Sequence, residues 1–250
     1  MLKHMPISVT VLTKNSQETL GKTLDSLRSF PEVIVYDTGS SDETLALASS
    51  FPHVVVHEGP FEGFGATHNK ASSLARHDWI LSIDSDEVLT QELMDEIHQL
   101  NLDPTCIYQI PRHNFYNDKW IKWCGGWYPD PVVRLYHRKS TCFSHDAVHE
   151  KILVKQLTVI PLSSPLFHFP YRSIDDFLNK MQTYSSLFVM QNQDKKSSLF
   201  KALFHGWFAF LKSYFLKRGF LGGREGLIIS IYNGHTAFYK YLKLVDRQKL

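Results

Sequence analysis

The chain has 250 residues, of which 43% are hydrophobic, 21% charged and 13% aromatic. This composition excludes a chain that is disordered throughout, and the length suits one large α/β domain, with or without an appendage. The net charge of +2 hides an asymmetry, because residues 195–250 carry eleven Lys and Arg against two carboxylates. Their net charge of +9 leaves about −7 for residues 1–194 and predicts an anionic partner for the C-terminal part, a membrane or nucleic acid.

The N-terminus and the cysteines favour a cytoplasmic protein. Residues 1–8 hold no apolar stretch long enough for a signal peptide. The three cysteines, Cys106, Cys124 and Cys142, form no CxxC pair and are too few for a disulfide framework. We therefore expect them to be reduced packing residues.

The first hundred residues alternate between strand and helix patterns. Apolar, β-branched runs predict strands at 7–12, 33–36, 53–57 and 79–83, and a helix is expected at 66–76. Capping-box spacing predicts that two further helices begin at Asn15 with Glu18 and at Ser40 with Glu43. The alternation predicts a Rossmann-like, mainly parallel sheet, whose ligands bind beyond the carboxyl ends of the strands.

Polar residues stand at those strand ends, in 13–15, 37–42 and 84–87. The strongest signal is Asp84-Ser85-Asp86-Glu87, directly after an apolar strand. Two carboxylates two residues apart can face one ligand, so that one holds a ribose and the other a cation bridging two phosphates. A solvated acidic turn is the alternative.

The pattern changes after residue 101. Strand-like pieces rich in Trp, Tyr and Pro run to about residue 159 and predict a mixed extension of the sheet, and the chain is helical from Ser173. Several aromatic residues crowd a short stretch: Trp120, Trp123, Trp127 and Tyr128. They could stack on the apolar faces of sugars or pack in a core.

These runs together resemble a known family, the family 2 inverting glycosyltransferases with the GT-A fold. The resemblance rests on Thr13-Lys-Asn15, Asp37-Thr-Gly-Ser-Ser-Asp-Glu-Thr44, Gly63-Phe-Gly-Ala-Thr-His-Asn69 and Ile83-Asp-Ser-Asp-Glu87. Later runs are similar to the bacterial lipopolysaccharide core glucosyltransferase branch: Gly125-Gly-Trp-Tyr-Pro-Asp130, Arg134-Leu-Tyr136, Val148-His-Glu150 and Gly219-Phe-Leu-Gly-Gly223. The resemblance covers nearly the whole chain.

The resemblance implies a donor site for a UDP-sugar. Asp37 would bind the uracil ring, Asp84 the ribose, and Asp86 a Mg²⁺ or Mn²⁺ ion on the diphosphate. The same motifs bring Thr13, Asn15 and Asn69 into the nucleotide-sugar site. One departure is His68, where relatives usually carry Arg, which puts a diphosphate contact from this position in doubt.

An inverting transfer also needs a general base, for which Glu150 is the candidate and Asp130 the alternative. We assign acceptor binding to Trp127, Tyr128, Arg134 and His149. A zinc site at His145 and His149 is a competing interpretation that the strand-and-loop pattern disfavours, since i,i+4 spacing joins two rings only on a helix.

Aromatic residues recur at helical spacing from Phe200 to Phe215, interleaved with Lys and His. No apolar run approaches the ~20 residues that span a bilayer. The pattern suits a helix lying in an anionic membrane interface, or else a helical pair packed on the catalytic domain or serving as a dimer contact. Nucleic acid is disfavoured, because the basic residues accompany bulky aliphatic ones and no recognition motif is present.

We therefore predict a GT-A catalytic domain at 1–170, with a nucleotide-sugar half at about 1–100 and an acceptor half at about 101–170. Residues 171–250 would form a helical, membrane-associated extension. The predicted activity is metal-dependent transfer of a sugar, glucose by family resemblance, from a UDP-sugar to a lipid-linked glycan of the lipopolysaccharide inner core. The predicted location is the inner face of the inner membrane. Alternatives are another donor or acceptor, a nucleotidyltransferase, which would need a Gly-rich phosphate loop near the first strand, and a non-catalytic sugar- or lipid-binding scaffold.

Overall fold

The computed structural model describes residues 6–144, 151–154, 156–192 and 194–247. The chain divides into two compact units. The first comprises Met1–Arg112 and Pro131–His168, and the second comprises His113–Asp130 and Phe169–Leu250. The functional division at residue 170 stays a prediction.

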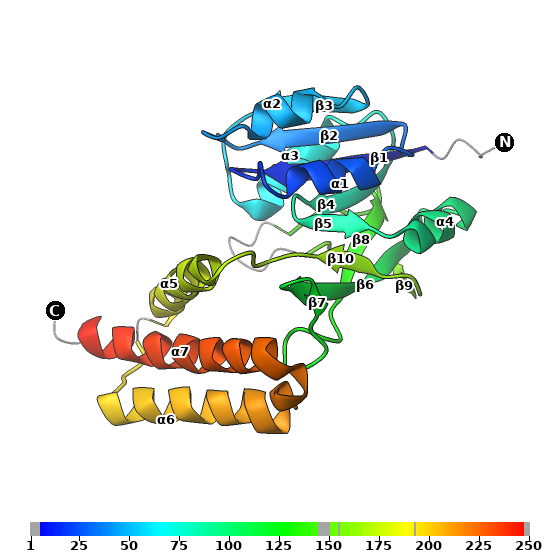
Figure 1. Cartoon of the computed structure of the whole chain (residues 1–250). Helices are drawn as coiled ribbons and strands as arrows, with labels where there is room; N and C mark the ends of the chain where they lie inside the picture. Colours follow the sequence, from blue (N-terminus) through cyan, green and yellow to red (C-terminus); the bar gives the residue numbers. More distant parts are fainter. Residues whose placement is uncertain (1–5, 145–150, 155, 193, 248–250) are drawn as a thin grey trace. The chain divides into compact units, whose positions relative to one another are not determined.

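The first unit is built on a mixed β-sheet whose strand order is β3-β2-β1-β4-β8-β6 (Figure 1). Its four N-terminal strands are parallel: β1 (Ile7–Thr13), β2 (Glu32–Asp37), β3 (Val54–Glu58) and β4 (Trp79–Asp84). Beyond β4 the sheet is mixed, through β8 (Pro131–His137), β6 (Cys106–Tyr116) and β9 (Thr158–Pro161), and β5 (Glu87–Leu89) pairs with β10 (Leu166–His168). The helices are α1 (Leu20–Ser26), α2 (Thr44–Ser49), α3 (Phe64–Ser73) and α4 (Gln91–Gln99). The predicted Rossmann-like sheet and its mixed extension are confirmed.

The core of this unit explains why the parallel strands read as continuous apolar runs. β2 is buried along its whole length, as expected for a parallel strand covered on both faces. Three leucines of the first helical segment, Leu20, Leu24 and Leu27, are fully buried against β1. Each contributes about 1.5–3 kcal/mol by burial. The strand register pairs Thr13 with Asp37 and Leu12 with Asp84, so the polar strand ends meet at one edge.

Both predicted capping boxes are wrong. The first helix begins at Leu20 and the second at Thr44, and neither has a side-chain cap. Asn15 and Ser40 bond to each other's loops instead: Asn15 N–H donates to Ser40 Oγ at 2.8 Å, and the Asn15 side-chain oxygen accepts from Ser41 N–H at 2.8 Å. The side chains that sequence spacing assigns to helix ends therefore join the loop after β1 to the loop after β2.

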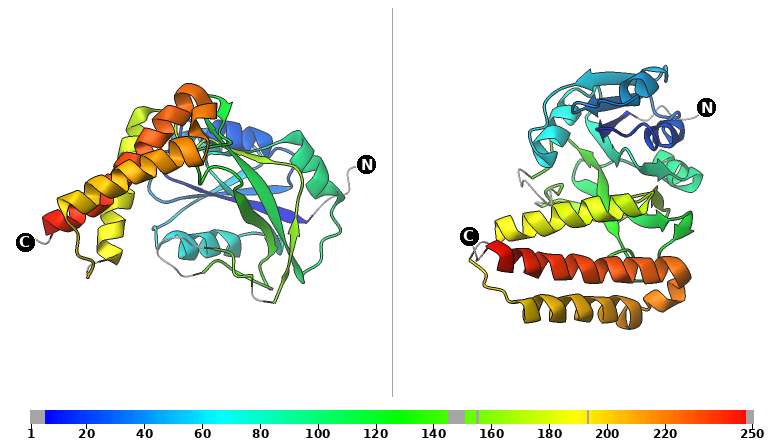
Figure 2. Two further views of the ribbon diagram at one scale, coloured as in Figure 1. Left: turned by 90° about the horizontal axis from the view of Figure 1, so that it is seen from below. Right: turned by 60° about the vertical axis from the view of Figure 1, so that its left-hand side comes forward.

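The second unit consists mainly of helices, as predicted from Ser173 onward. Its elements are β7 (Lys119–Trp120), which pairs with the end of β6, α5 (Ile174–Gln191), α6 (Leu199–Leu211), a π-helical turn η1 (Lys212–Leu216), a 3₁₀ turn η2 (Gly219–Gly222) and α7 (Gly223–Arg247). α7 runs between α5 and α6 and packs against both (Figure 2). α6 and α7 approach closely at Gly206 and Gly234, where a Cβ on Gly206 would lie 2.8 Å from Phe238 Cβ. No described helix is both long and apolar enough to cross a bilayer.

Candidate functional site

The loop after β2 holds Asp37 in a fixed position. Asp37 is fully buried, and its Oδ1 accepts hydrogen bonds from Gly39 N–H at 2.8 Å and Ser40 N–H at 2.7 Å. Gly39 adopts φ +99°, a conformation that favours glycine, so the turn can fold back on the carboxylate. Asp37 Oδ2 accepts only from Ser40 Oγ among the described residues. Since a carboxylate oxygen has two acceptor positions, Oδ2 can take a further N–H donor.

Two other predicted nucleotide-sugar residues have structural partners. The Thr13 backbone oxygen accepts from Thr38 N–H at 3.0 Å, while its buried hydroxyl has no partner among the described residues. The Asn69 amide pairs reciprocally with the backbone of Phe143, at 3.0 Å and 2.9 Å. Asn69 therefore fastens α3 to the strand region before residue 145, and its contact with a donor stays a prediction.

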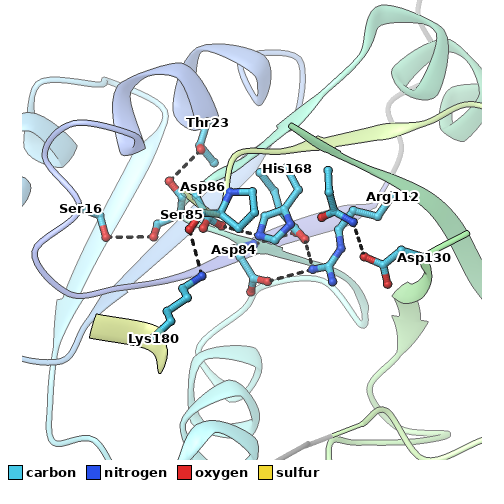
Figure 3. Close-up of polar contacts among 12 residues, drawn as sticks. Ser16, Thr23, Asp84, Ser85, Asp86, Arg112, Asp130, His168 and Lys180 are labelled. Atoms are coloured by element: carbon cyan, nitrogen blue, oxygen red, sulfur yellow. Dashed lines mark hydrogen bonds and ion pairs between the residues drawn. The ribbon is translucent and has the colours of Figure 1, made fainter. Parts of the chain in front are cut away.

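The acidic loop after β4 is held by hydrogen bonds with hydroxyl groups of Ser16 and Thr23 (Figure 3). Ser85 Oγ lies 2.9 Å from Ser16 Oγ, and Thr23 Oγ donates to the Ser85 backbone oxygen at 3.1 Å. Ser85 is thus tied to the segment that follows β1. Its neighbours Asp84 and Asp86 keep 36% and 28% of their side chains exposed. The loop presents two carboxylates on an anchored backbone.

Asp84 belongs to a cluster of four charged side chains. The Arg134 guanidinium bonds to the Asp84 carboxylate and lies 2.5 Å from Glu87 Oε1. Arg112 lies 3.0 Å from Glu87 Oε1 and 3.9 Å from Asp84 Oδ2 (Figure 3). Glu87 is fully buried and also accepts from the Asp84 N–H at 3.0 Å. The positive charges of the two arginines therefore balance the negative charges of the two carboxylates.

The cluster fixes the charge of its members. Burial alone would raise the pKa of Asp84, but the Arg134 guanidinium, with smaller contributions from His68, His168 and Arg112, holds that pKa below its ordinary value. Burial likewise opposes the charge of Arg134, but Asp84 and Glu87 raise the pKa of its guanidinium. Asp84 is therefore ionised throughout the physiological range.

Asp86 faces His168, the last residue of β10. His168 Nε2 lies 3.5 Å from Asp86 Oδ1, and the imidazole is 13% exposed (Figure 3). The Asp86 carboxylate comes from the loop between β4 and β5 and the imidazole from β10, and both groups can bind a metal ion.

His68 is a packing residue in this structure. It is 3% exposed, its ring stacks on Phe143 with the centroids 4.3 Å apart, and Nδ1 lies 3.2 Å from Ser82 Oγ. Burial, opposed by Asp84 and aided by Arg134, lowers its pKa to about 4. His68 is therefore neutral at pH 7 and adds no positive charge to the acidic loop.

Comparison with known proteins now identifies the family. Residues 8–157 match the model of Glycosyl transferase family 2. The chain belongs to this family. It is 29% identical to an uncharacterized glycosyltransferase of Rickettsia prowazekii over 96% of this chain and 87% of the relative. It is also 26% identical to the lipopolysaccharide core biosynthesis glycosyltransferase LpsC of Rhizobium meliloti, over 100% of this chain and 96% of the relative.

Its fold is also similar to that of solved structures. A mannosyltransferase of Pyrobaculum calidifontis, solved with GDP-mannose and Mn²⁺, superposes with a TM-score of 0.54 at 15% identity, over 97% of this chain and 86% of that one. This similarity supports the GT-A fold of the family, and the predicted fold class is confirmed.

The acidic loop of this family 2 glycosyltransferase has groups that suit a divalent cation. The Asp86 carboxylate is partly exposed and is a hard oxygen ligand of the kind that Mg²⁺ and Mn²⁺ prefer, whereas the Asp84 carboxylate is paired with Arg134. No group of three or more His, Cys, Asp and Glu side chains converges on one point within the described ranges.

The predicted acceptor residues lie in different surroundings. Trp127 is 7% exposed in the core of the second unit, whereas Tyr128 is 44% exposed and lies edge-on to Trp120 at 5.3 Å. Asp130 accepts from the Asn114 side-chain amide at 2.9 Å. Arg134 lies in the buried charge cluster. Glu150, His149 and the alternative zinc residue His145 lie outside the described residues.

Sequence reasoning missed three members of the site: Glu87, Arg112 and His168. Glu87 stood in the quoted acidic motif without a role of its own, and Arg112 and His168 stand in no motif. The available signal was electrostatic. A buried edge with several carboxylates requires compensating cations, so Arg and His in the later strands were the residues to consider.

Proposed function

We propose that this family 2 glycosyltransferase moves glucose from UDP-glucose, with inversion, onto a hydroxyl of a lipid-linked glycan, the lipopolysaccharide inner core. The observation that carries the proposal is the meeting of Asp37 and the Asp84–Asp86 loop at one edge of the sheet. The relationship to LpsC supports the choice of acceptor.

The donor would lie along this edge, over Thr13 and Asn15. Asp37 Oδ2 would accept the uracil ring N–H, because Oδ1 is already occupied by two backbone donors. Asp84 would accept from a ribose hydroxyl. Its ionised state, maintained by Arg134, makes it a strong acceptor.

Asp86, with His168, would hold Mg²⁺ or Mn²⁺ against the diphosphate. When bound, the cation would supply charge neutralisation for the departing nucleoside diphosphate. The residues of the chain would perform the remaining steps. Glu150 would take the proton of the acceptor hydroxyl as it attacks the anomeric carbon, and Asp130, oriented by Asn114, is the alternative base.

The acceptor glycan would contact Tyr128, whose exposed ring offers a stacking face. Contacts from Trp127, Arg134 and His149 remain part of this proposal. We do not include nucleic acid among the partners, because the basic residues lie among exposed aromatic and aliphatic side chains.

The helical extension would place the enzyme on the membrane that carries its acceptor, on the inner face of the inner membrane. A set of large apolar side chains is exposed along α6, η1 and η2: Leu199, Phe200, Leu203, Phe204, Trp207, Phe208, Phe215, Leu216, Phe220 and Leu221. Soluble monomers seldom expose so many apolar residues together, and their presence indicates a partner surface. Basic residues among them fit anionic lipid.

The test is a transfer assay with purified protein, Mn²⁺ and a panel of nucleotide sugars. We expect UDP release and a mass gain of one hexose on lipopolysaccharide inner-core acceptor with UDP-glucose. If the enzyme releases nucleoside diphosphate faster from a GDP-sugar or from another UDP-sugar, UDP-glucose is not the donor. Donor binding is measured separately by the rise in Tm that a ligand specific to the folded state must cause.

A further inference from the structure

A glycine-containing loop of the second unit has no role in the proposed transfer. Cys124, Gly125 and Gly126 have consecutive positive φ angles of 74°, 72° and 79°. Cys124 anchors the loop, since its N–H donates to the Lys217 backbone oxygen at 3.0 Å and its own oxygen accepts from Ser213 Oγ at 2.9 Å. A Cβ on Gly125 would lie 3.1 Å from Lys217 Cγ. Glycine at this position thus allows the loop to lie directly on the stem of Lys217.

A cavity of about 290 Å³ adjoins this loop. Gly125 and Gly126 line one part of it, and Lys212, Lys217 and Asn233 line another. Its described lining contains two lysines and no Asp or Glu. The nearby Glu225 is paired with Lys119 at 3.4 Å. The cavity is therefore suited to an anion, and its size accommodates a phosphate with its ester substituents.

Exposed apolar residues close in sequence to the two lysines indicate what kind of molecule carries the anion. Phe215 and Leu216 are 54% and 71% exposed, and Phe220 and Leu221, which follow shortly after, are about half exposed. Apolar side chains next to cations match the boundary of a bilayer, where a phosphate lies directly above acyl chains. A free metabolite phosphate would give no reason for exposed Phe and Leu beside the cavity.

We propose that Lys212, Lys217 and the Gly125–Gly126 loop bind the phosphate of an anionic lipid headgroup. The ammonium groups would pair with the phosphate oxygens, while Phe215 and Leu216 enter the acyl region. This proposal rests on the membrane docking of the proposed function and adds a specific headgroup site to it. The site would fix the orientation of the helical extension on the bilayer.

The first experiment measures binding of dihexanoyl phosphatidylglycerol, a short-chain lipid used below its micelle concentration, by titration calorimetry. Lys212→Gln with Lys217→Gln removes both cations, and Lys201→Gln with Lys240→Gln removes two charges from α6 and α7, outside the cavity. We expect the first pair to weaken binding about 30-fold, from about fivefold per lysine, and the second pair to change it less than about threefold. Lys212→Arg with Lys217→Arg should restore most of the affinity.

Equal losses in the two Gln pairs, or no binding by the wild type, would overturn the headgroup site. Inorganic phosphate serves as the second probe: if it binds as tightly as the lipid, the cavity is a free-phosphate site and the lipid assignment is wrong. Circular dichroism and Tm establish that each variant is folded.

Co-sedimentation with vesicles of phosphatidylcholine alone or with 30% phosphatidylglycerol (a chosen composition) separates this proposal from membrane docking. If the wild type sediments with the vesicles and the two Gln pairs sediment to the same extent, membrane docking is supported and the headgroup site is contradicted. If the wild type does not sediment, the membrane-docking proposal is wrong. The titration with the short-chain lipid then still tests whether the cavity binds a headgroup. Transfer to a soluble acceptor tests the donor site independently of both.

Discussion

The two units distribute their charged and apolar groups in opposite ways. In the first unit, Glu87 and Arg134 are buried together at the end of the parallel strands. In the second, Phe200 and Trp207 are 79% and 61% exposed on a helix. A buried charge and an exposed aromatic residue each oppose folding preferences, so each indicates selection for something other than stability. The contrast shows that the proposed donor site and the proposed docking surface differ in physical character: one buries paired charges, and the other exposes aromatic side chains.

The largest expected effect comes from the metal position in the first unit. Asp86→Ala should abolish detectable transfer and remove the metal dependence of UDP binding. The fold should persist, because the side chain is partly exposed on an anchored loop. Transfer assays, Mn²⁺-dependent UDP titration and Tm check the three statements. Full activity of the variant, or of the wild type in excess EDTA, would contradict the metal assignment.

The choice of base gives the next effect. Glu150→Gln keeps the size of the side chain but cannot accept a proton, so turnover should fall by roughly 10²–10⁴-fold with donor affinity near wild type. Asp130→Asn is the matched comparison, since its hydrogen bond with Asn114 tolerates an amide oxygen. If the Glu150→Gln enzyme is active and the Asp130→Asn enzyme is inactive, Asp130 is the base and the assignment to Glu150 is wrong.

The buried charge cluster should be sensitive to loss of one partner. Arg134→Met leaves the fully buried Glu87 with Arg112 as its remaining ion-pair partner and should lower the free energy of unfolding by about 3 kcal/mol. Arg28→Met breaks an ion pair whose side chains are 67% and 58% exposed, and should cost less than about 1 kcal/mol. Urea unfolding compares the two. Similar losses of unfolding free energy in the two variants would contradict the expectation that breaking the buried cluster costs more than breaking an exposed ion pair.

His68 should make the first unit sensitive to acid. Its folded pKa of about 4 lies below the ordinary value of 6.5, so the unfolded chain binds the proton more readily. The contribution of neutral, buried His68 to the free energy of unfolding is therefore fully present above pH 6.5 and is lost as the pH falls toward 4. Between pH 8 and pH 5 the loss is about 2 kcal/mol. His68→Gln should reduce the pH dependence of the free energy of unfolding by that amount, and unchanged dependence would refute it.

The smallest effect on stability is expected on the exposed helix of the second unit. Phe200→Ser and Trp207→Ser should each change the free energy of unfolding by less than about 0.5 kcal/mol. Each should weaken vesicle binding about tenfold or more. Ile229→Ser, at a fully buried position, is the control and should cost about 3 kcal/mol. A change of oligomeric state in the exposed variants, with vesicle binding intact, would assign this face to a dimer.

The parallel strands and the strand-end position of Asp37, Asp84 and Asp86 could be predicted, because period and turn chemistry are local properties. The capping boxes failed because Asn15 and Ser40 meet partners about 25 residues away, which spacing does not reveal. Arg112 and His168 could not be assigned for the same reason, since their ion-pair partners Glu87 and Asp86 lie far from them in the sequence. Exposure of the C-terminal aromatic residues also required the structure, because helical spacing is the same for a packed and an open face.

The reciprocal bonds between Asn15 and the 40–41 turn bear on how a nucleotide would be selected. They join two loops from neighbouring strands into one element before any ligand arrives, and Asp37 is already held by two backbone donors. Little backbone freedom is then left to lose when a base binds, so affinity depends on shape and hydrogen-bond match. A cytosine ring, which lacks the N3–H of uracil, would meet an acceptor that cannot move away. Rigidity at this edge would act as a filter between nucleotides.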